Sequence, residues 1–248
     1  MPLTPEAIRH LEAVGDRAWP PAEAEPHDGW VLRATGTGIG RRVNSVAPLA
    51  RGTLPLEQNV ATAATFYRHR GLPPTFKLTD AALPENLDEY LAERGFRVDA
   101  PVLIMTRALG PGGAPIPHLP AEPAPEWLAV NAAVPSHYGA APEAFLELLG
   151  RIRPPAAFAT HHTGGEAAAI GMAVADGEWV GLFEIGTVPE HRRRGRATAV
   201  VEDLMAWGAG RGARTAYLQV MEENAPARAL YEDLGFAEAY RYWYRVSG

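Results

Sequence analysis

The run of residues 188–197 constrains this chain most, because it joins a strand-like segment, residues 178–187, to a helix-like segment, residues 198–210. Two small residues in the run, Gly195 and Ala197, leave room for a ligand to approach the backbone where the helix begins. The first amides of a helix have no acceptor inside the helix, and the helix dipole adds partial positive charge there. The run therefore predicts a backbone cradle for a phosphate group.

A second block of sequence follows downstream of this run. A strand-like segment over residues 217–220 leads to Asn224. A helix-like segment over residues 225–234 contains Tyr231 and is followed by the pair Gly235-Phe236. In this order and with this gap, the two blocks resemble the acetyl-CoA loop and the second signature of the GNAT superfamily of N-acetyltransferases. Together they span about a quarter of the chain, and the two blocks in combination support the resemblance more strongly than either block alone.

The resemblance implies the GNAT fold, an α+β architecture with a mixed, mostly antiparallel sheet and flanking helices. In that fold one parallel central pair of strands splays, and the acyl-pantetheine lies in the split. The pattern of apolar residues agrees with such a fold. It predicts helices over residues 126–133 and 142–151, and strands over residues 155–161, 167–175 and 237–246.

The chain also resembles itself at an offset of about 140 residues, so that residues 87–96 lie over residues 227–236. A glycine- and proline-rich stretch, residues 110–117, separates the two copies and is typical of a linker. We therefore predict a tandem of two GNAT-like halves. The first is a degenerate domain over residues 1–108, and the second is the catalytic domain over residues 109–248.

The first half is expected not to bind acetyl-CoA. Its residues 52–57 lie opposite the cradle and contain neither a basic residue nor a pair of small residues in the required spacing. Pro55 also has no amide hydrogen to donate to a phosphate. The first half would instead shape the acceptor site or replace a dimer partner, so we expect a monomer with an internal pseudo-dimer, or a homodimer.

The resemblance implies acetyl-CoA as the cosubstrate. The backbone amides of the cradle would bind its diphosphate, the arginines would attract its negative charge, and the end of the preceding strand would pair with pantetheine. Asn224 would cap the following helix and also bind pantetheine, while Arg228 would contact the 3′-phosphate or face water. The residues expected to bind acetyl-CoA are Ile185, Gly186, Thr187, Val188, Arg192, Arg193, Arg194, Gly195, Arg196, Ala197, Thr198, Asn224 and Arg228.

Two residues are candidates for catalysis. Tyr231 matches the tyrosine that protonates the departing coenzyme A thiolate in the family, although a packed core tyrosine would give the same helical pattern. Glu184 is the candidate general base, because a carboxylate in an otherwise apolar strand is costly unless it is paired or used. A salt-bridged strand glutamate is the alternative for Glu184, and a water relay is the alternative for the base. Gln219 stands where some relatives have a glutamate, and an amide cannot accept the proton.

Composition narrows the classes of function further. The formal net charge of −6 argues against general nucleic-acid binding, and no cysteine is available for a disulfide or a thiol nucleophile. No apolar run is long enough to span a membrane, and the polar N-terminal residues are unlike a signal peptide, so we expect a cytoplasmic protein without membrane partners.

Two further features are expected to be structural. The glycines in residues 36–40 resemble a dinucleotide loop, but residues 41–46 look like a strand, so we expect a glycine hairpin between two strands. His161 and His162 are adjacent, so in a strand they point to opposite faces and cannot share a metal ion. No metal site is expected.

The predicted reaction is transfer of an acetyl group from acetyl-CoA to an amine by direct attack, without a covalent enzyme intermediate. The alternative is a non-catalytic acyl-CoA-binding or regulatory module, and a longer acyl group is a further possibility. The acceptor is a small-molecule or peptide amine, and protein N-termini, lysines, polyamines, aminoglycosides and free amino acids all stay open. One of His161, His162 and His137, the last together with Tyr138, could line its pocket.

Overall fold

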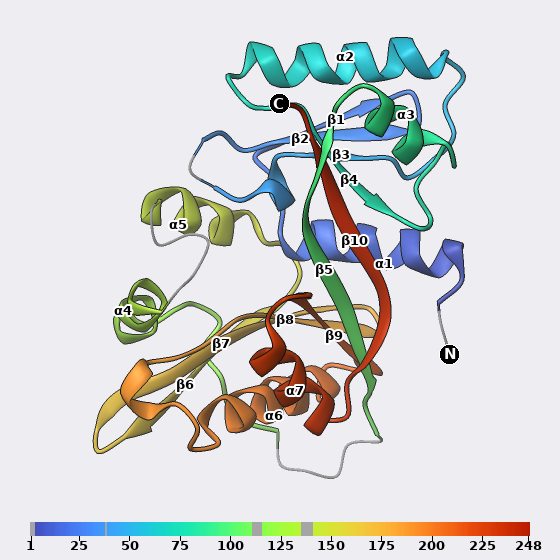
Figure 1. Cartoon of the computed structure of the whole chain (residues 1–248). Helices are drawn as coiled ribbons and strands as arrows, with labels where there is room; N and C mark the ends of the chain where they lie inside the picture. Colours follow the sequence, from blue (N-terminus) through green and yellow to red (C-terminus); the bar gives the residue numbers. More distant parts are fainter. Residues whose placement is uncertain (1–2, 38, 111–115, 135–140) are drawn as a thin grey trace.

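One continuous mixed sheet runs through the molecule (Figure 1). The structure is a computed structural model that describes residues 3–37, 39–110, 116–134 and 141–248. Its strands are β1 (Glu23–His27), β2 (Trp30–Ala34), β3 (Val46–Ala47), β4 (Thr75–Thr79), β5 (Arg97–Ala108), β6 (Ala156–Thr163), β7 (Glu166–Asp176), β8 (Trp179–Thr187), β9 (Thr215–Met221) and β10 (Ala237–Val246). Within these described ranges the strand order is β1-β2-β3-β4-β10-β5-β9-β8-β7-β6.

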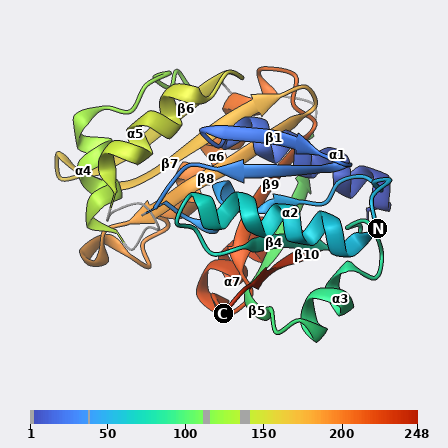
Figure 2. The ribbon, with the colours of Figure 1, turned by 90° about the horizontal axis from the view of Figure 1, so that it is seen from above.

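Helices cover both faces of the sheet (Figures 1 and 2). They are α1 (Pro5–Ala18), α2 (Leu56–His69), α3 (Leu87–Glu93), α4 (Pro125–Ala133), α5 (Pro142–Arg151), α6 (Arg196–Ala209) and α7 (Ala225–Asp233), with short 3-10 turns η1 (Arg41–Val43) and η2 (Pro189–His191). Successive residues of β7 face the helices on opposite sides of the sheet, because side chains alternate along a strand. Met172 belongs to the apolar cluster of α1, α4 and α5, whereas Ala173 belongs to the cluster of α6 and α7. The fold is the predicted α+β arrangement.

The internal repeat predicted from the sequence is visible in the fold. A shift of about 140 residues places α2 on α6 and β5 on β10. Each half also contains one parallel pair of strands, β3 with β4 and β8 with β9. The molecule is thus a tandem of two GNAT-like halves joined in one sheet.

The last strand of each half is exchanged between the halves. β10 lies between β4 and β5, and β5 pairs with β9 of the other half. Figure 1 shows β5 and β10 as the two long strands that connect the upper and lower layers. Residues 1–108 and 109–248 therefore share a continuous sheet, and the boundary between them stays a prediction because most of the predicted linker, residues 110–117, lies outside the described ranges.

Most predicted elements lie within a few residues of the observed ones, but the strand predicted over residues 41–46 is wrong. Of this segment only Val46, together with Ala47 after it, pairs with β2, whereas Arg41–Val43 forms η1. The side chain of Asn44 explains the difference. Its Oδ1 accepts from the Thr35 amide at 2.7 Å, and its Nδ2 donates to the Gly36 carbonyl at 2.9 Å. This side chain takes hydrogen bonds that a strand ladder would otherwise supply.

Candidate active site

The central parallel pair of strands splits. β8 and β9 pair from Trp179 and Thr215 as far as Leu182 and Leu218, the last partners in the ladder. Just beyond this point β8 carries a β-bulge, since one residue of β7 opposes both Glu184 and the residue after it. Glu184 adopts the left-handed conformation, with φ of 49°. A bulge bends its strand and increases the local twist, which accounts for the separation of β8 from β9.

A cavity of about 360 Å³ opens at this split. Its walls are residues 182–185 of β8 and 218–221 of β9, together with side chains from α4, α7, β5 and β10. The first half also contributes Trp19 at the end of α1 and two arginines, Arg41 and Arg42, in η1. The cavity is therefore built by both halves of the tandem.

The predicted cradle lies where η2 leads into α6. Gly195 caps the helix in the left-handed conformation, with φ of 73°, which glycine adopts without strain. A Cβ atom at Gly195 would meet nothing within 4 Å, so the space over this residue is open. The Arg192 Nε donates to the Thr187 carbonyl at 3.2 Å and fastens the turn to the end of β8.

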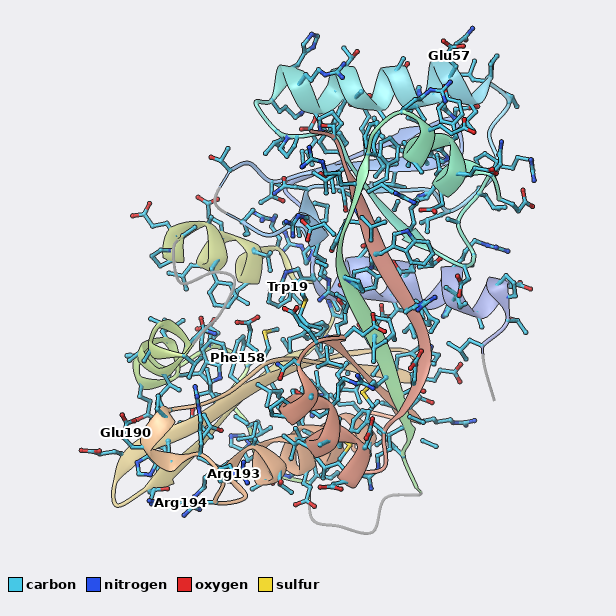
Figure 3. The ribbon with its side chains drawn as sticks, viewed as in Figure 1. Trp19, Glu57, Phe158, Glu190, Arg193 and Arg194 are labelled. Atoms are coloured by element: carbon cyan, nitrogen blue, oxygen red, sulfur yellow. The ribbon has the colours of Figure 1, made fainter. Side chains whose placement is uncertain are left out.

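The remaining predicted cradle residues lie in the same turn and the first turn of α6. Figure 3 shows Arg193 and Arg194 beside the start of α6. Arg193 is in the left-handed conformation, with φ of 58°. Three further residues, Arg196, Ala197 and Thr198, form the first turn of the helix, whose amides have no partner inside the helix.

The end of β8 presents the residues predicted to pair with pantetheine. Gly186 and Thr187 pair with β7 on one side of β8, and the Val188 amide donates to the Ala168 carbonyl at 3.0 Å. Gly186 has to be small, because a Cβ atom there would lie 2.8 Å from a methyl of Val134. The other edge of this segment has no ladder partner in the described chain beyond Leu182. A ligand can pair with such an edge as an added strand does.

Glu184 lies on the wall of the cavity. Its Oε2 accepts a hydrogen bond from Asn131 Nδ2 at 2.8 Å. Burial raises the pKa of the Glu184 carboxyl, while this hydrogen bond and the charge of Arg42 act in the opposite direction. A carboxyl with a raised pKa is suited to accept a proton near neutral pH. The salt-bridged alternative is not seen, because no ion pair of Glu184 forms within the described residues.

Tyr231 of α7 also lines the cavity. Its side chain is 8% exposed and packs edge-on against Phe236. Burial raises the pKa of Tyr231 to about 12, so its hydroxyl stays protonated at neutral pH. Tyr231 is therefore both a packed residue and a cavity residue.

Asn224 and Arg228 hold the start of α7. Asn224 Oδ1 accepts from the Ala227 amide at 3.2 Å, which is the predicted helix cap, and Asn224 also lines the cavity. Arg228 Nη1 donates to the Glu222 carbonyl at 3.1 Å. Gln219 lines the cavity as well, and its Oε1 accepts from the Tyr242 hydroxyl at 2.9 Å.

Several cavity residues were not anticipated from the sequence, and three of them carry polar groups that matter for the site. Arg42, Asn131 and Tyr242 come from η1, α4 and β10, and none of them lies near the two sequence blocks. The fold brings them together through the exchanged strand and through packing of the first half on the second. A basic pair just after a glycine-rich loop was the only local signal for Arg42.

His161 and His162 point to opposite faces of β6, as predicted. His161 Nε2 lies 2.8 Å from Asp203 of α6, and His162 Nε2 lies 3.1 Å from Glu126 of α4. The described part of the chain contains no group of three or more His, Cys, Asp or Glu residues placed to hold a metal ion. The predicted candidates His137 and Tyr138 lie outside the described residues.

No described helix is both long and apolar enough to cross a membrane.

The comparisons with known proteins agree with this geometry. A family model described as probable histone acetyltransferase Rv0428c C-terminal matches residues 5–245. The uncharacterized N-acetyltransferase YobR of Bacillus subtilis is 28% identical over 250 residues, covering 96% of this chain and 98% of that protein. The probable histone acetyltransferase Rv0428c of Mycobacterium tuberculosis is 31% identical over 249 residues, covering 95% of this chain and 72% of that protein.

A solved tandem GNAT protein from the clavulanic acid biosynthesis pathway has the same fold. It superposes with a TM-score of 0.60 at 15% identity, covering 77% of this chain and 70% of that chain. The named relatives support acyl transfer as the general activity. The chain belongs to the Rv0428c C-terminal family, within the GNAT superfamily of N-acetyltransferases.

Proposed function

We propose that this protein transfers an acetyl group from acetyl-CoA to an amine by direct attack. The observation that carries the proposal is the continuity between the split of β8 from β9 and the open turn at Gly195. A diphosphate at the start of α6 would accept hydrogen bonds from free helix amides. The pantetheine arm would then follow the unpaired edge of β8 into the cavity, and its thioester would lie between Glu184 and Tyr231.

In this proposal Glu184 removes a proton from the attacking amine, directly or through a water molecule. The amine nitrogen forms a bond to the thioester carbonyl carbon, and the carbon–sulfur bond breaks. Tyr231 donates its hydroxyl proton to the departing thiolate, which suits a phenol that stays protonated at neutral pH. Neither step needs a metal ion or a covalent enzyme intermediate. Proton transfer by a positioned group contributes typically about 10²–10⁴-fold to such a rate.

The first half is proposed to complete the acceptor side of the cavity rather than to bind a second acetyl-CoA. Trp19, Arg41 and Arg42 line the cavity, which supports this role. The turn that corresponds to the cradle is filled by the protein itself, because Asp28 accepts from the amides of Thr53 and Leu54 at 2.8 and 2.9 Å. Such a pseudo-dimer would need no second chain to form its site.

The experiment is release of free coenzyme A thiol, measured with the whole chain, acetyl-CoA and a panel of amines. We expect thiol release that depends on an amine and that yields the acetylated amine by mass spectrometry. Binding of acetyl-CoA without thiol release for any amine would favour the non-catalytic module. Thiol release with a longer acyl-CoA but not with acetyl-CoA would overturn the choice of acyl group.

A further inference from the structure

Arg42 is held rigidly at the wall of the cavity. Its guanidinium carbon lies 4.9 Å from the centre of the Phe183 ring and 5.5 Å from that of Trp19. These two rings stack on each other with centres 5.3 Å apart. The Arg42 Nη2 also donates to the Gly15 carbonyl at 3.2 Å. Contacts of this kind fix the plane of the guanidinium before any ligand binds.

Arg42 forms no ion pair within the described residues, although its charge favours the charged form of Glu184. Within the described residues no carboxylate oxygen lies within 4.0 Å of its guanidinium, and none of the remaining residues of the chain is acidic. A guanidinium has five N–H donors, and the Gly15 carbonyl is the acceptor that the described structure gives it. Arg41 differs, because it pairs with Asp99 at the surface. Arg42 therefore keeps donors and a full charge for a ligand.

The charged residues of the cavity also form a definite pattern. Its charged lining residues in the described chain are Arg41, Arg42 and Glu184, and the ion pair with Asp99 offsets the charge of Arg41. Arg42 and Glu184 are left as one cation and one anion on the cavity wall. Such a wall suits a zwitterion better than a polyamine or another polycation, because Arg42 repels a second cationic group. Glu184 alone can attract an ammonium group.

Binding of the acetyl-CoA arm does not account for the positive charge of Arg42. The proposed diphosphate site is the start of α6, which belongs to the second half, whereas Arg42 belongs to η1 of the first half. Arg42 packs on Trp19 and Phe183, which belong to the apolar cluster of α1, α4 and α5. The helix α6 lies with the other cluster, across the sheet. Arg42 thus faces the acceptor side of the split.

We infer that the acceptor is an amine that also carries an anionic oxygen group, a carboxylate or a phosphate, and that Arg42 binds this group. The inference rests on the proposed acetyl transfer. A planar guanidinium matches both oxyanions through paired hydrogen bonds. The ammonium of the same molecule would face Glu184, so the site would select a zwitterion. Arg42 is a specificity-determining residue in this account and takes no part in bond making.

The test compares matched acceptors that differ only in the anionic group. The panel contains the common amino acids and their amides, O-phosphoethanolamine and ethanolamine, and spermidine as a polycation. We expect kcat/KM for the anionic member of at least one matched pair to exceed that of its neutral partner about tenfold or more, chiefly through KM. A charge-assisted pair of hydrogen bonds supplies an effect of this size. The carboxylate and phosphate arms tell the two oxyanions apart.

Three variants complete the design. Arg42→Gln is expected to reduce the anionic-to-neutral ratio about tenfold, and Arg42→Lys is expected to retain part of it because the charge remains. Arg17→Gln is the matched control, since it removes the same charge from α1 at an exposed ion pair with Asp176 outside the cavity. The rates with the anionic and with the neutral acceptor are measured on the same preparation of each variant. Partial unfolding lowers both rates equally and leaves their ratio unchanged.

The outcomes separate the inference from the proposed function. No heat with acetyl-CoA in calorimetry would overturn acetyl transfer itself. The inference alone would be overturned if no anionic acceptor were acetylated faster than its neutral partner, or if spermidine were acetylated faster than every anionic acceptor. Binding of acetyl-CoA without acetylation of any anionic amine would also contradict it, as would a ratio that Arg42→Gln leaves unchanged.

Discussion

The Asp28 carboxylate accepts a hydrogen bond from the Leu54 amide at 2.9 Å, in the turn of the first half that corresponds to the open cradle of the second. The fit is tight, because a Cβ atom on Gly52 would lie 2.0 Å from Asp28 Oδ2. In the turn of the second half the space over Gly195 is open. The two halves thus share an architecture, but the turn of the first half holds the protein's own carboxylate, whereas the proposed anion site of the second half is accessible.

Replacement of Asp28 should make stability less dependent on pH. Hydrogen bonds from the Thr53 and Leu54 amides hold the pKa of Asp28 below its usual value. Its stabilising effect is therefore present above the unfolded pKa of about 3.9 and is lost as pH falls through the folded value. We expect Asp28→Asn to unfold at a lower temperature than the wild type at pH 7, with the gap closing in acid. The exposed Asp80→Asn serves as control, and equal losses for both variants would count against this role.

Glu184→Gln should lower the rate and raise stability at neutral pH. The variant cannot accept a proton, so kcat/KM should fall about a hundredfold or more in a pH profile of thiol release. Burial raises the pKa of Glu184, so its stabilising effect is complete below the unfolded pKa and is lost as pH rises through the folded value. The neutral amide avoids that loss, and its melting temperature at pH 7 should exceed that of the wild type. An unchanged pH–rate profile would point to a water relay without Glu184.

Removal of the side-chain amide of Asn131 should shift the pH–rate profile of thiol release. Asn131 donates to the Glu184 carboxylate and so favours its charged form. In Asn131→Leu the pKa of Glu184 should rise, and the acid limb of the rate profile should move to higher pH. A profile that only decreases in height would indicate a structural role for Asn131.

Tyr231→Phe should separate chemistry from binding. The hydroxyl is the atom proposed to protonate the thiolate, while the ring packs against Phe236. Loss of the hydroxyl alone should reduce kcat about a hundredfold. The dissociation constant for acetyl-CoA, measured by calorimetry, should stay within about twofold of the wild type. A variant with full kcat would leave Tyr231 as a packing residue only.

Gly195→Ala should weaken acetyl-CoA binding by about tenfold or more, because the cradle needs a left-handed residue and an open approach. Gly71→Ala provides the matched control. Gly71 has φ of 66° and equally open space around it, but it lies at the end of α2 in the first half. Both variants should lose a similar amount of stability, about 1 kcal/mol. Equal affinity for acetyl-CoA in the two variants would contradict the assignment of the cradle.

Local patterns in the sequence predicted the parts of the fold that depend on neighbours along the chain. The helix over residues 142–151 and the strand over residues 237–246 agree with α5 and β10, because apolar periodicity marks both and Pro142 marks the start of the helix. The cap at Asn224 was predicted because asparagine is a preferred helix cap and Pro226 suits the first turn. The repeat at an offset of about 140 residues can be recognised in the sequence because both halves have apolar residues at corresponding core positions.

The unpredicted features depend on contacts between distant segments. The exchange of β5 and β10 is a choice of strand partner, which a local pattern does not encode. The hydrogen bond from Asn131 to Glu184 at the bulge joins residues 53 positions apart. Arg42 reaches the cavity because Asn44 replaces the expected strand ladder with side-chain hydrogen bonds. These contacts give the acceptor side its chemistry, and they become visible only in three dimensions.

Isothermal titration calorimetry of the whole chain with acetyl-CoA tests the central claim most directly. With the cradle at Gly195 open and its counterpart filled by Asp28, the account predicts saturable binding of one acetyl-CoA per chain. No heat at millimolar acetyl-CoA, or two molecules bound per chain, would contradict it.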